Sequence, residues 1–287
     1  MKFIVGFVAV IGCVLGGYVM ADGHIEVLWQ PLEFLIIFGG GLGAFAIANP
    51  APILKGVLGN LSKLIKGPAY KKSSYLDILA VLYSLFKLAK SKGDLALEGH
   101  VENPHDSAIF NQFPSFAHDH HALEFLCDYL RMLTLGVSNP HEVADIMDVE
   151  LENHHEHMHA ISAAMVGLGE GLPALGIVAA VLGVIHTMGS ISEPPEILGH
   201  LIGAALVGTF SGILFSYGFV TPMGQSLGAT FTEEGAYFAC MKAGVIAHMQ
   251  GYAPQVSIEF ARKTIPHHVR PTFKELEDAL SNIGNPE

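Results

Sequence analysis

Charged residues are scarce in this sequence, and four long stretches contain none. Asp, Glu, Lys and Arg make up 15% of the 287 residues, whereas about 25% is usual for soluble domains. The mean hydropathy is +0.43. The uncharged stretches are residues 3–21, 34–54, 171–192 and 197–232.

Each stretch is long enough to cross a bilayer, whose apolar core needs about 20 residues of helix. Buried cores of soluble proteins are built from shorter apolar segments that are broken by turn signals. The sequence therefore predicts an all-α integral membrane protein with four transmembrane helices, the last at residues 201–222. The first stretch can alternatively be read as a signal peptide, because "VMA" precedes Asp22. Its four glycines instead favour a helix that packs in the membrane.

Basic residues are missing from two short segments: the one between the first and second uncharged stretches, and the one between the third and fourth. All 15 Lys and Arg residues lie elsewhere, so the positive-inside rule places both termini in the cytoplasm. We expect four parts in chain order: two transmembrane helices, a cytoplasmic helical domain, two further transmembrane helices and a cytoplasmic helical tail. Their bounds are 1–54, 55–165, 166–223 and 224–287.

Cysteine and net positive charge are also lacking. The three cysteines imply no disulfide framework. The net charge of −12 argues against a nucleic-acid partner, which calls for basic patches.

Apolar residues at helical spacing predict five helices outside the membrane. The first is dense enough in apolar positions to pack on both sides and stops at Gly93. The five lie at 73–93, 119–138, 140–162, 233–250 and 273–280.

The motif "HEHMH" matches the H-E-x-x-H pattern of zinc hydrolases. His155 and His159 stand one helical turn apart, with Glu156 as the candidate base. The flanking sequence offers no third ligand at a known spacing, and the chain has 16 histidines. The alternative is a solvated, His-rich helix face, which the sequence favours.

Acidic residues do not occur inside the predicted spans. Glu33 and Glu170 lie only at span ends, whereas intramembrane charges usually mark ion paths. Hydroxyl groups such as that of Thr209 do not titrate near neutrality. Either the protein is not a channel, or a partner supplies the acid. Pro173 and Pro222 either begin and end helices or act as hinges.

An ordered set of motifs along nearly the whole chain resembles the MotA family, the stator subunits of the bacterial flagellar motor. The matching stretches are "GGYVM", "QPLEFLIIFGGGLGAF", "VENPHDSAIF", "LCDYLRM", "LPALGIVAAVLGVIH", "LVGTFSGILFSYGFVTP", "GYAPQVSIEFARKT" and "RPTFKELE".

The resemblance implies a proton-conducting complex in which a MotB partner supplies the titrating Asp. MotB's single helix would sit inside a ring of these subunits, a pentamer in the family. Small residues of the third and fourth spans would let it approach: Gly176, Ala179, Gly183, Gly208 and Gly212. The ion path would follow Thr209, Ala180, Tyr217, Glu170 and Glu150, with Pro173 and Pro222 as conformational hinges.

The resemblance also implies that the complex converts ion-motive force into torque in the inner membrane. Lys90 and Glu98 match the positions that contact a FliG-type rotor protein, although the better-known branch has Arg at the first. Ala180 stands where sodium-driven relatives tend to carry a hydroxyl, so protons are expected as the transported ion. No covalent catalysis, cofactor or metal is expected. The nearest alternative is an ExbB/TolQ-type energiser of outer-membrane processes.

Overall fold

The chain forms two compact units of helices. A computed structural model describes residues 2–281, and no strand occurs in that range. The first unit comprises Met1–Gly67 and His157–Thr230, and the second comprises Pro68–Glu156 and Phe231–Glu287. We call them the membrane unit and the helical unit. The predicted all-α class is confirmed.

Four helical segments are long and apolar enough to cross a membrane. In the described residues these are Lys2–Met20, Ile25–Ala48, Pro140–Gly189 and Pro195–Met249. The prediction of four transmembrane helices is thus confirmed by length and composition. The last two segments continue far beyond their apolar parts.

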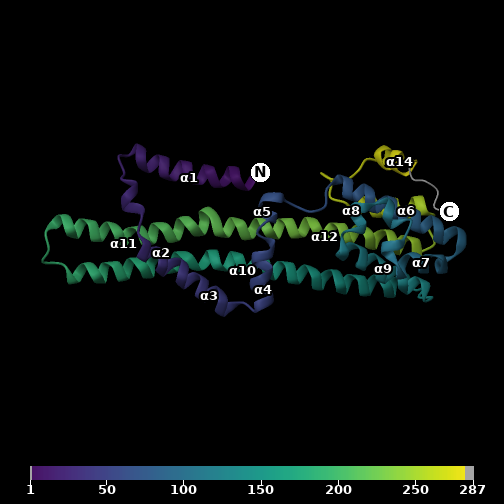
Figure 1. Ribbon diagram of the computed structural model, residues 1–287, viewed down its shortest axis with the longest axis horizontal. Helices are drawn as coiled ribbons and strands as arrows, with labels where there is room; N and C mark the ends of the chain where they lie inside the picture. Colours follow the sequence, from purple (N-terminus) through teal and green to yellow (C-terminus); the bar gives the residue numbers. More distant parts are fainter. Residues whose placement is uncertain (1, 282–287) are drawn as a thin grey trace. The chain divides into compact units, whose positions relative to one another are not determined.

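The membrane unit contains the following elements (Figure 1): α1 (Lys2–Met20), η1 (Ile25–Leu28), α2 (Pro31–Phe34), η2 (Leu35–Gly39), α3 (Gly40–Ala48), α4 (Ala51–Asn60), α5 (Lys63–Lys66), the second part of α10 (Pro140–Gly189), α11 (Pro195–Phe215), η6 (Ser216–Val220) and the start of α12 (Thr221–Met249).

The helical unit contains the remaining elements: α6 (Lys72–Lys92), η3 (Asp94–Leu97), α7 (Glu98–Glu102), η4 (Pro104–Asp106), η5 (Phe110–Gln112), α8 (Pro114–Ala117), α9 (His120–Thr134), the first part of α10, the end of α12, α13 (Pro254–Thr264) and α14 (Phe273–Ser281).

The observed unit boundaries differ from the expected domain boundaries. We expected divisions after residues 54, 165 and 223, and the units divide after 67, 156 and 230. The reason is that α10 and α12 are continuous helices of 50 and 29 residues that contribute to both units. A change in hydropathy along such a helix does not coincide with a change in packing partners.

Helix α6 lies at the centre of the helical unit. Five consecutive residues of this helix, 78–82, are buried, which means that every side of the helix is covered. This confirms the prediction that the first cytoplasmic helix packs on both sides. The helix ends where Gly93 adopts a φ of 86°, a conformation that favours glycine.

Helix α13 was not predicted from the sequence. Arg262 on this helix is 7% exposed. Its guanidinium donates to Glu259 at 2.5 and 2.7 Å and to the carbonyl of Pro271 at 2.9 Å. These bonds satisfy a charge that would otherwise be costly to bury.

Two π-helical turns and two prolines interrupt the regular hydrogen bonding of the membrane unit. The turns are η2 and η6, and π-turns of this kind insert an extra residue into a helix. Pro173 lies inside α10, and Pro222 is the second residue of α12, directly after η6. Neither proline begins or ends a continuous helical run. The structure therefore favours bends at these positions.

Candidate functional site

Helices α10 and α11 lie side by side and touch through their backbones (Figure 1). A Cβ atom built on Gly176 would lie 2.8 Å from the carbonyl oxygen of Gly208, and one on Gly212 would lie 2.7 Å from the carbonyl oxygen of Leu172. A Cβ atom on Gly183 would lie 2.7 Å from the Cβ of Ala205. No side chain fits at these distances. We call this contact line the glycine seam.

The small residues that we expected to receive a partner helix form this seam. Gly176 and Gly183 lie on the α10 side, and Gly208 and Gly212 lie on the α11 side. Ala179 is fully buried, and its Cβ lies 3.1 Å from the position of a Cβ on Gly208. Small residues let membrane helices approach closely, and here they do so within one chain. Their packing against a partner helix stays a prediction.

The carboxylate of Glu33 reaches the glycine seam from α2. Its Oε2 lies 3.0 Å from the position of a Cβ on Gly208, and its Oε1 lies 3.6 Å from that of Gly183. Oε2 is buried and has no hydrogen-bond partner among the described residues. Glu33 lies at the start of the second apolar segment, and its side chain extends to the contact between α10 and α11.

The sequence places Glu33 at a span end and does not indicate that its side chain extends to the glycine seam. Only Phe34 separates Glu33 from the π-turn η2 along the chain, and hydropathy does not report where a side chain points. A carboxylate buried without a partner is costly in an apolar surrounding. Such groups mark functional positions in membranes more often than structural ones.

Two of the expected ion-path residues lie beside the seam, and one lies apart from it. The backbone nitrogen of Ala180 is 3.3 Å from the position of a Cβ on Gly208, and the Cα of Thr209 is 3.4 Å from that of Gly176. Tyr217 is 64% exposed. It continues an exposed apolar face of the α11–η6 run that comprises Ile202, Leu206, Phe210 and Ile213.

The two expected acidic residues lie in different units. Glu170 is exposed in the membrane unit, next to Gly169, where a Cβ would lie 2.3 Å from the hydroxyl of Thr221. Glu150 belongs to the helical unit and accepts a hydrogen bond of 2.5 Å from the hydroxyl of Tyr129. Burial raises the pKa of Tyr129, and this hydrogen bond raises it further. The role of Glu150 in the ion path stays a prediction.

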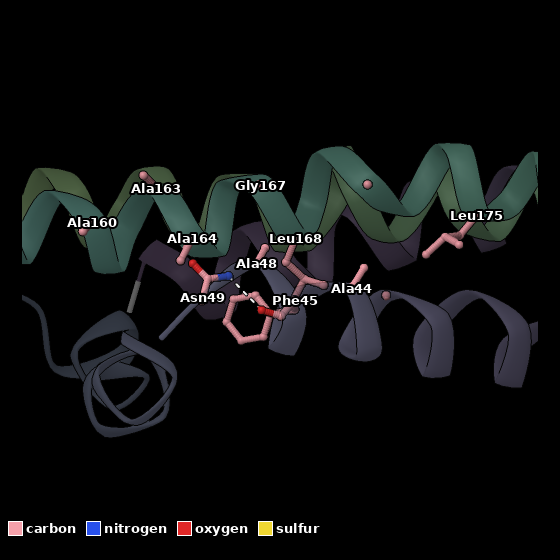
Figure 2. Close-up of a pocket in the computed structure, with 12 residues that line it drawn as sticks. Ala44, Phe45, Ala48, Asn49, Ala160, Ala163, Ala164, Gly167, Leu168 and Leu175 are labelled. Atoms are coloured by element: carbon pink, nitrogen blue, oxygen red, sulfur yellow. Dashed lines mark hydrogen bonds between the residues drawn. The ribbon is translucent and has the colours of Figure 1, made fainter. Parts of the chain in front are cut away.

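The membrane unit contains a groove of about 500 Å³ between α3 and α10 (Figure 2). Eight of its twelve lining residues are Gly or Ala, and none of the twelve is titratable. The side chain of Asn49 donates to the carbonyl of Phe45 at 2.9 Å, as the dashed line shows. This groove offers space for apolar atoms and no group for acid–base chemistry.

The H-E-x-x-H motif does not assemble a metal site in residues 2–281. His155, Glu156 and His159 are exposed on α10. No group of three His, Cys, Asp or Glu side chains that could hold a metal ion occurs in this range. The zinc-hydrolase alternative therefore lacks the third ligand that such a site requires.

The two expected rotor-contact residues are exposed on the helical unit. Lys90 lies in the last turn of α6, and Glu98 begins α7. Both side chains face solvent in this unit. Gly93 separates their helices and redirects the chain between them.

Comparisons with known proteins show which family this chain resembles over its whole length. A family model described as the motility protein A N-terminal region matches residues 4–93, and one described as the MotA/TolQ/ExbB proton channel family matches residues 118–239. "Motility protein A" of Salmonella typhimurium is 40% identical over 286 residues, covering 100% of this chain and 97% of that protein. "Chemotaxis protein LafT" of Vibrio parahaemolyticus is 34% identical over 281 residues, covering 98% and 99%.

A solved structure is similar over the same length. The flagellar MotAB stator complex from Bacillus subtilis superposes with a TM-score of 0.73 and 27% identity, covering 96% of this chain and 98% of that chain.

Proposed function

Because this chain belongs to the motility protein A family and is a flagellar stator subunit, we propose that its glycine seam and Glu33 form its share of a proton path. The chain works with a MotB partner and is built around membrane-spanning helices. The observation that carries the proposal is the buried Oε2 of Glu33, which has no hydrogen-bond partner among the described residues and lies at Gly208, beside Ala180.

In this proposal the partner supplies the acid that is protonated and released in each cycle. Its helix docks on the exposed apolar face of α11, which ends at Tyr217. Thr209 and Ala180 lie beside the seam, and both are partly exposed. Glu33 provides a second carboxylate at the outer part of the path, and Glu170 lies towards the cytoplasm.

Proton passage drives a change in packing, and no covalent reaction, metal or cofactor takes part. One proton that crosses 100 mV releases about 2.3 kcal/mol. An amount of this size is enough to bias two alternative packings of close-fitting helices. When the packing changes, α10 changes direction at Pro173 and the α11–α12 run changes direction at Pro222.

Torque reaches the rotor through the exposed charges of the helical unit. Lys90 and Glu98 meet opposite charges on a FliG-type switch protein, in contacts that form and release at each step. Exposed ion pairs contribute about 0–1 kcal/mol, which suits such a repeating contact.

The subunits assemble as a ring, a pentamer as in the family, around the partner helices in the lipid of the bacterial inner membrane. Both chain ends face the cytoplasm, because the segments between the paired apolar stretches contain no Lys or Arg. The ExbB/TolQ alternative is disfavoured by the match to the motility protein A N-terminal region over residues 4–93.

Complementation of a non-motile strain that lacks its own stator subunit tests the proposal. The chain, expressed with its partner, is expected to restore swimming in sodium-free buffer, and a protonophore is expected to stop it. Swimming that requires sodium would contradict proton coupling. Lys90→Glu and Pro173→Ala should slow swimming, whereas His155→Ala should leave it intact. Lys92→Glu is the matched control, because it makes the same charge change two residues along α6.

A further inference from the structure

Three helices of the helical unit end around one cavity. Gly93, Gly136 and Gly251 follow α6, α9 and α12, with φ angles of 86°, 91° and 85°. All three line a cavity of about 440 Å³ together with Lys90 and His248. Helix C-termini carry partial negative charge, and three of them meet here.

His248 lies in this corner with one ring nitrogen unsatisfied. Its side chain is 8% exposed, and its ring stacks on Phe86 with the centroids 4.5 Å apart and the planes 4° apart. Nε2 lies 3.5 Å from Oδ1 of Asp94. Nδ1 is buried and has no hydrogen-bond partner in the described part of the chain. A neutral ring tolerates this as an unpaired acceptor, whereas a protonated ring must bury an unpaired N–H.

In the described part of the chain, two charged groups act on His248, and they have opposite signs. Asp94 on η3 attracts an imidazolium, and Lys90 on α6 repels it. The cavity's other lining side chains are uncharged: Ala89, Leu133, Val137, Ser138 and Met249. Lys90 and Asp94 are four residues apart, so the charge state of His248 acts on both.

We infer that His248 is a proton-responsive switch that regulates the charge and the order of the corner beside Lys90. Above its titration range the ring is neutral and packed on Phe86. When the cytoplasm turns acid, the imidazolium binds Asp94 and turns its buried Nδ1 towards water, which loosens the ends of α6 and α12. The corner then carries one more positive charge next to Lys90. The regulatory meaning of this change rests on the proposed rotor contact at Lys90.

The direction of the pH dependence follows from the surroundings. Burial lowers the pKa of His248 below its ordinary value of 6.5, Asp94 opposes this effect, and Lys90 adds to it. The unfolded chain therefore binds the proton more readily than the folded corner. The stability of the corner is complete above pH 6.5 and falls as the pH drops below it.

Hydrogen exchange of the full-length protein in lipid nanodiscs, without any rotor protein, tests the inference. Exchange is measured at pH 7.5 and 5.5 and is corrected for the intrinsic rates. In the wild type, peptides covering residues 86–97 and 244–252 should exchange at least about threefold faster at pH 5.5. His248→Phe keeps the ring stacked on Phe86 and should abolish this increase. The inference would be overturned if the exchange rate of these peptides did not change with pH in the wild type, or if the faster exchange at pH 5.5 persisted in His248→Phe.

Two further variants test whether the response is specific to His248 and Asp94. His268→Phe removes a histidine that is 59% exposed and lies 3.7 Å from Glu233, so the response should persist. Asp94→Asn changes a half-exposed side chain and removes the charge that raises the pKa of His248, so it should move the onset to lower pH. Swimming that is insensitive to Lys90→Glu would defeat the rotor-contact proposal and leave the exchange result standing.

Discussion

A methyl group at Gly212 is the sharpest perturbation of the glycine seam. In Gly212→Ala the new Cβ would lie 2.7 Å from the carbonyl oxygen of Leu172 and 2.9 Å from the Cα of Gly176. Both are backbone atoms, so no rotamer change relieves the clash. Ordinary contact begins at 3.4 Å, and α10 and α11 must therefore separate by about 0.7 Å at this point. Overpacking of this kind costs about 1–3 kcal/mol.

Alanine also favours a helix over glycine by about 1 kcal/mol, so a control must carry the same gain. Gly199→Ala lies on the same helix, and no atom of residues 2–281 that could clash lies within 4 Å of its new Cβ. The difference between the two variants isolates the packing cost. Each kcal/mol of destabilisation lowers the melting temperature by about 2–4 °C. In nanodiscs, Gly212→Ala should therefore melt roughly 2–12 °C below Gly199→Ala, as measured by circular dichroism. Equal melting temperatures would refute the backbone contact.

Three further predictions concern named side chains. Glu33→Gln keeps the size of the side chain but cannot carry a charge, so we expect tethered cells to rotate more slowly at an unchanged protein level. Glu33→Asp keeps the charge and should retain more speed. Wild-type speed in Glu33→Gln would show that this residue is not part of the proton path. Glu259→Gln should destabilise the helical unit by about 1–3 kcal/mol at pH 7. The hydrogen bond from Arg262 holds the pKa of Glu259 below its ordinary 4.5, so the wild type should lose this stability as the pH falls below 4.5, while the variant shows no such loss in urea titrations. Burial raises the pKa of Cys127 and Cys240 to about 12 each, so mass spectrometry should find neither thiol alkylated at pH 7.5 until the protein is denatured, and rapid labelling of either in the native state would contradict their burial.

Hydropathy and helix signals in the sequence predicted the parts of the fold that depend on composition. The four uncharged stretches became the four long apolar helices. The dense apolar pattern around residue 80 correctly indicated a helix that packs on both sides, and Gly93 correctly marked its end. These features are local, because each depends on residues within one segment.

Packing between segments was not predictable in the same way. The sequence shows that Gly176 and Gly212 are small, but it does not show that they touch each other. The reach of Glu33 depends on the short helix α2 and on the packing of α2 against α11. The unit boundaries depend on how far α10 and α12 continue as helices beyond their apolar parts, which composition does not report.

Proton uptake into liposomes tests the central claim most directly. The claim is that this chain surrounds an acid supplied by its partner and that its own Glu33 does not conduct alone. With a membrane potential imposed, vesicles that contain the chain and its partner should take up protons. Vesicles with the chain alone, or with a partner whose membrane carboxylate is neutralised, should stay at the leak of empty vesicles. Sustained uptake by the chain alone would contradict the account.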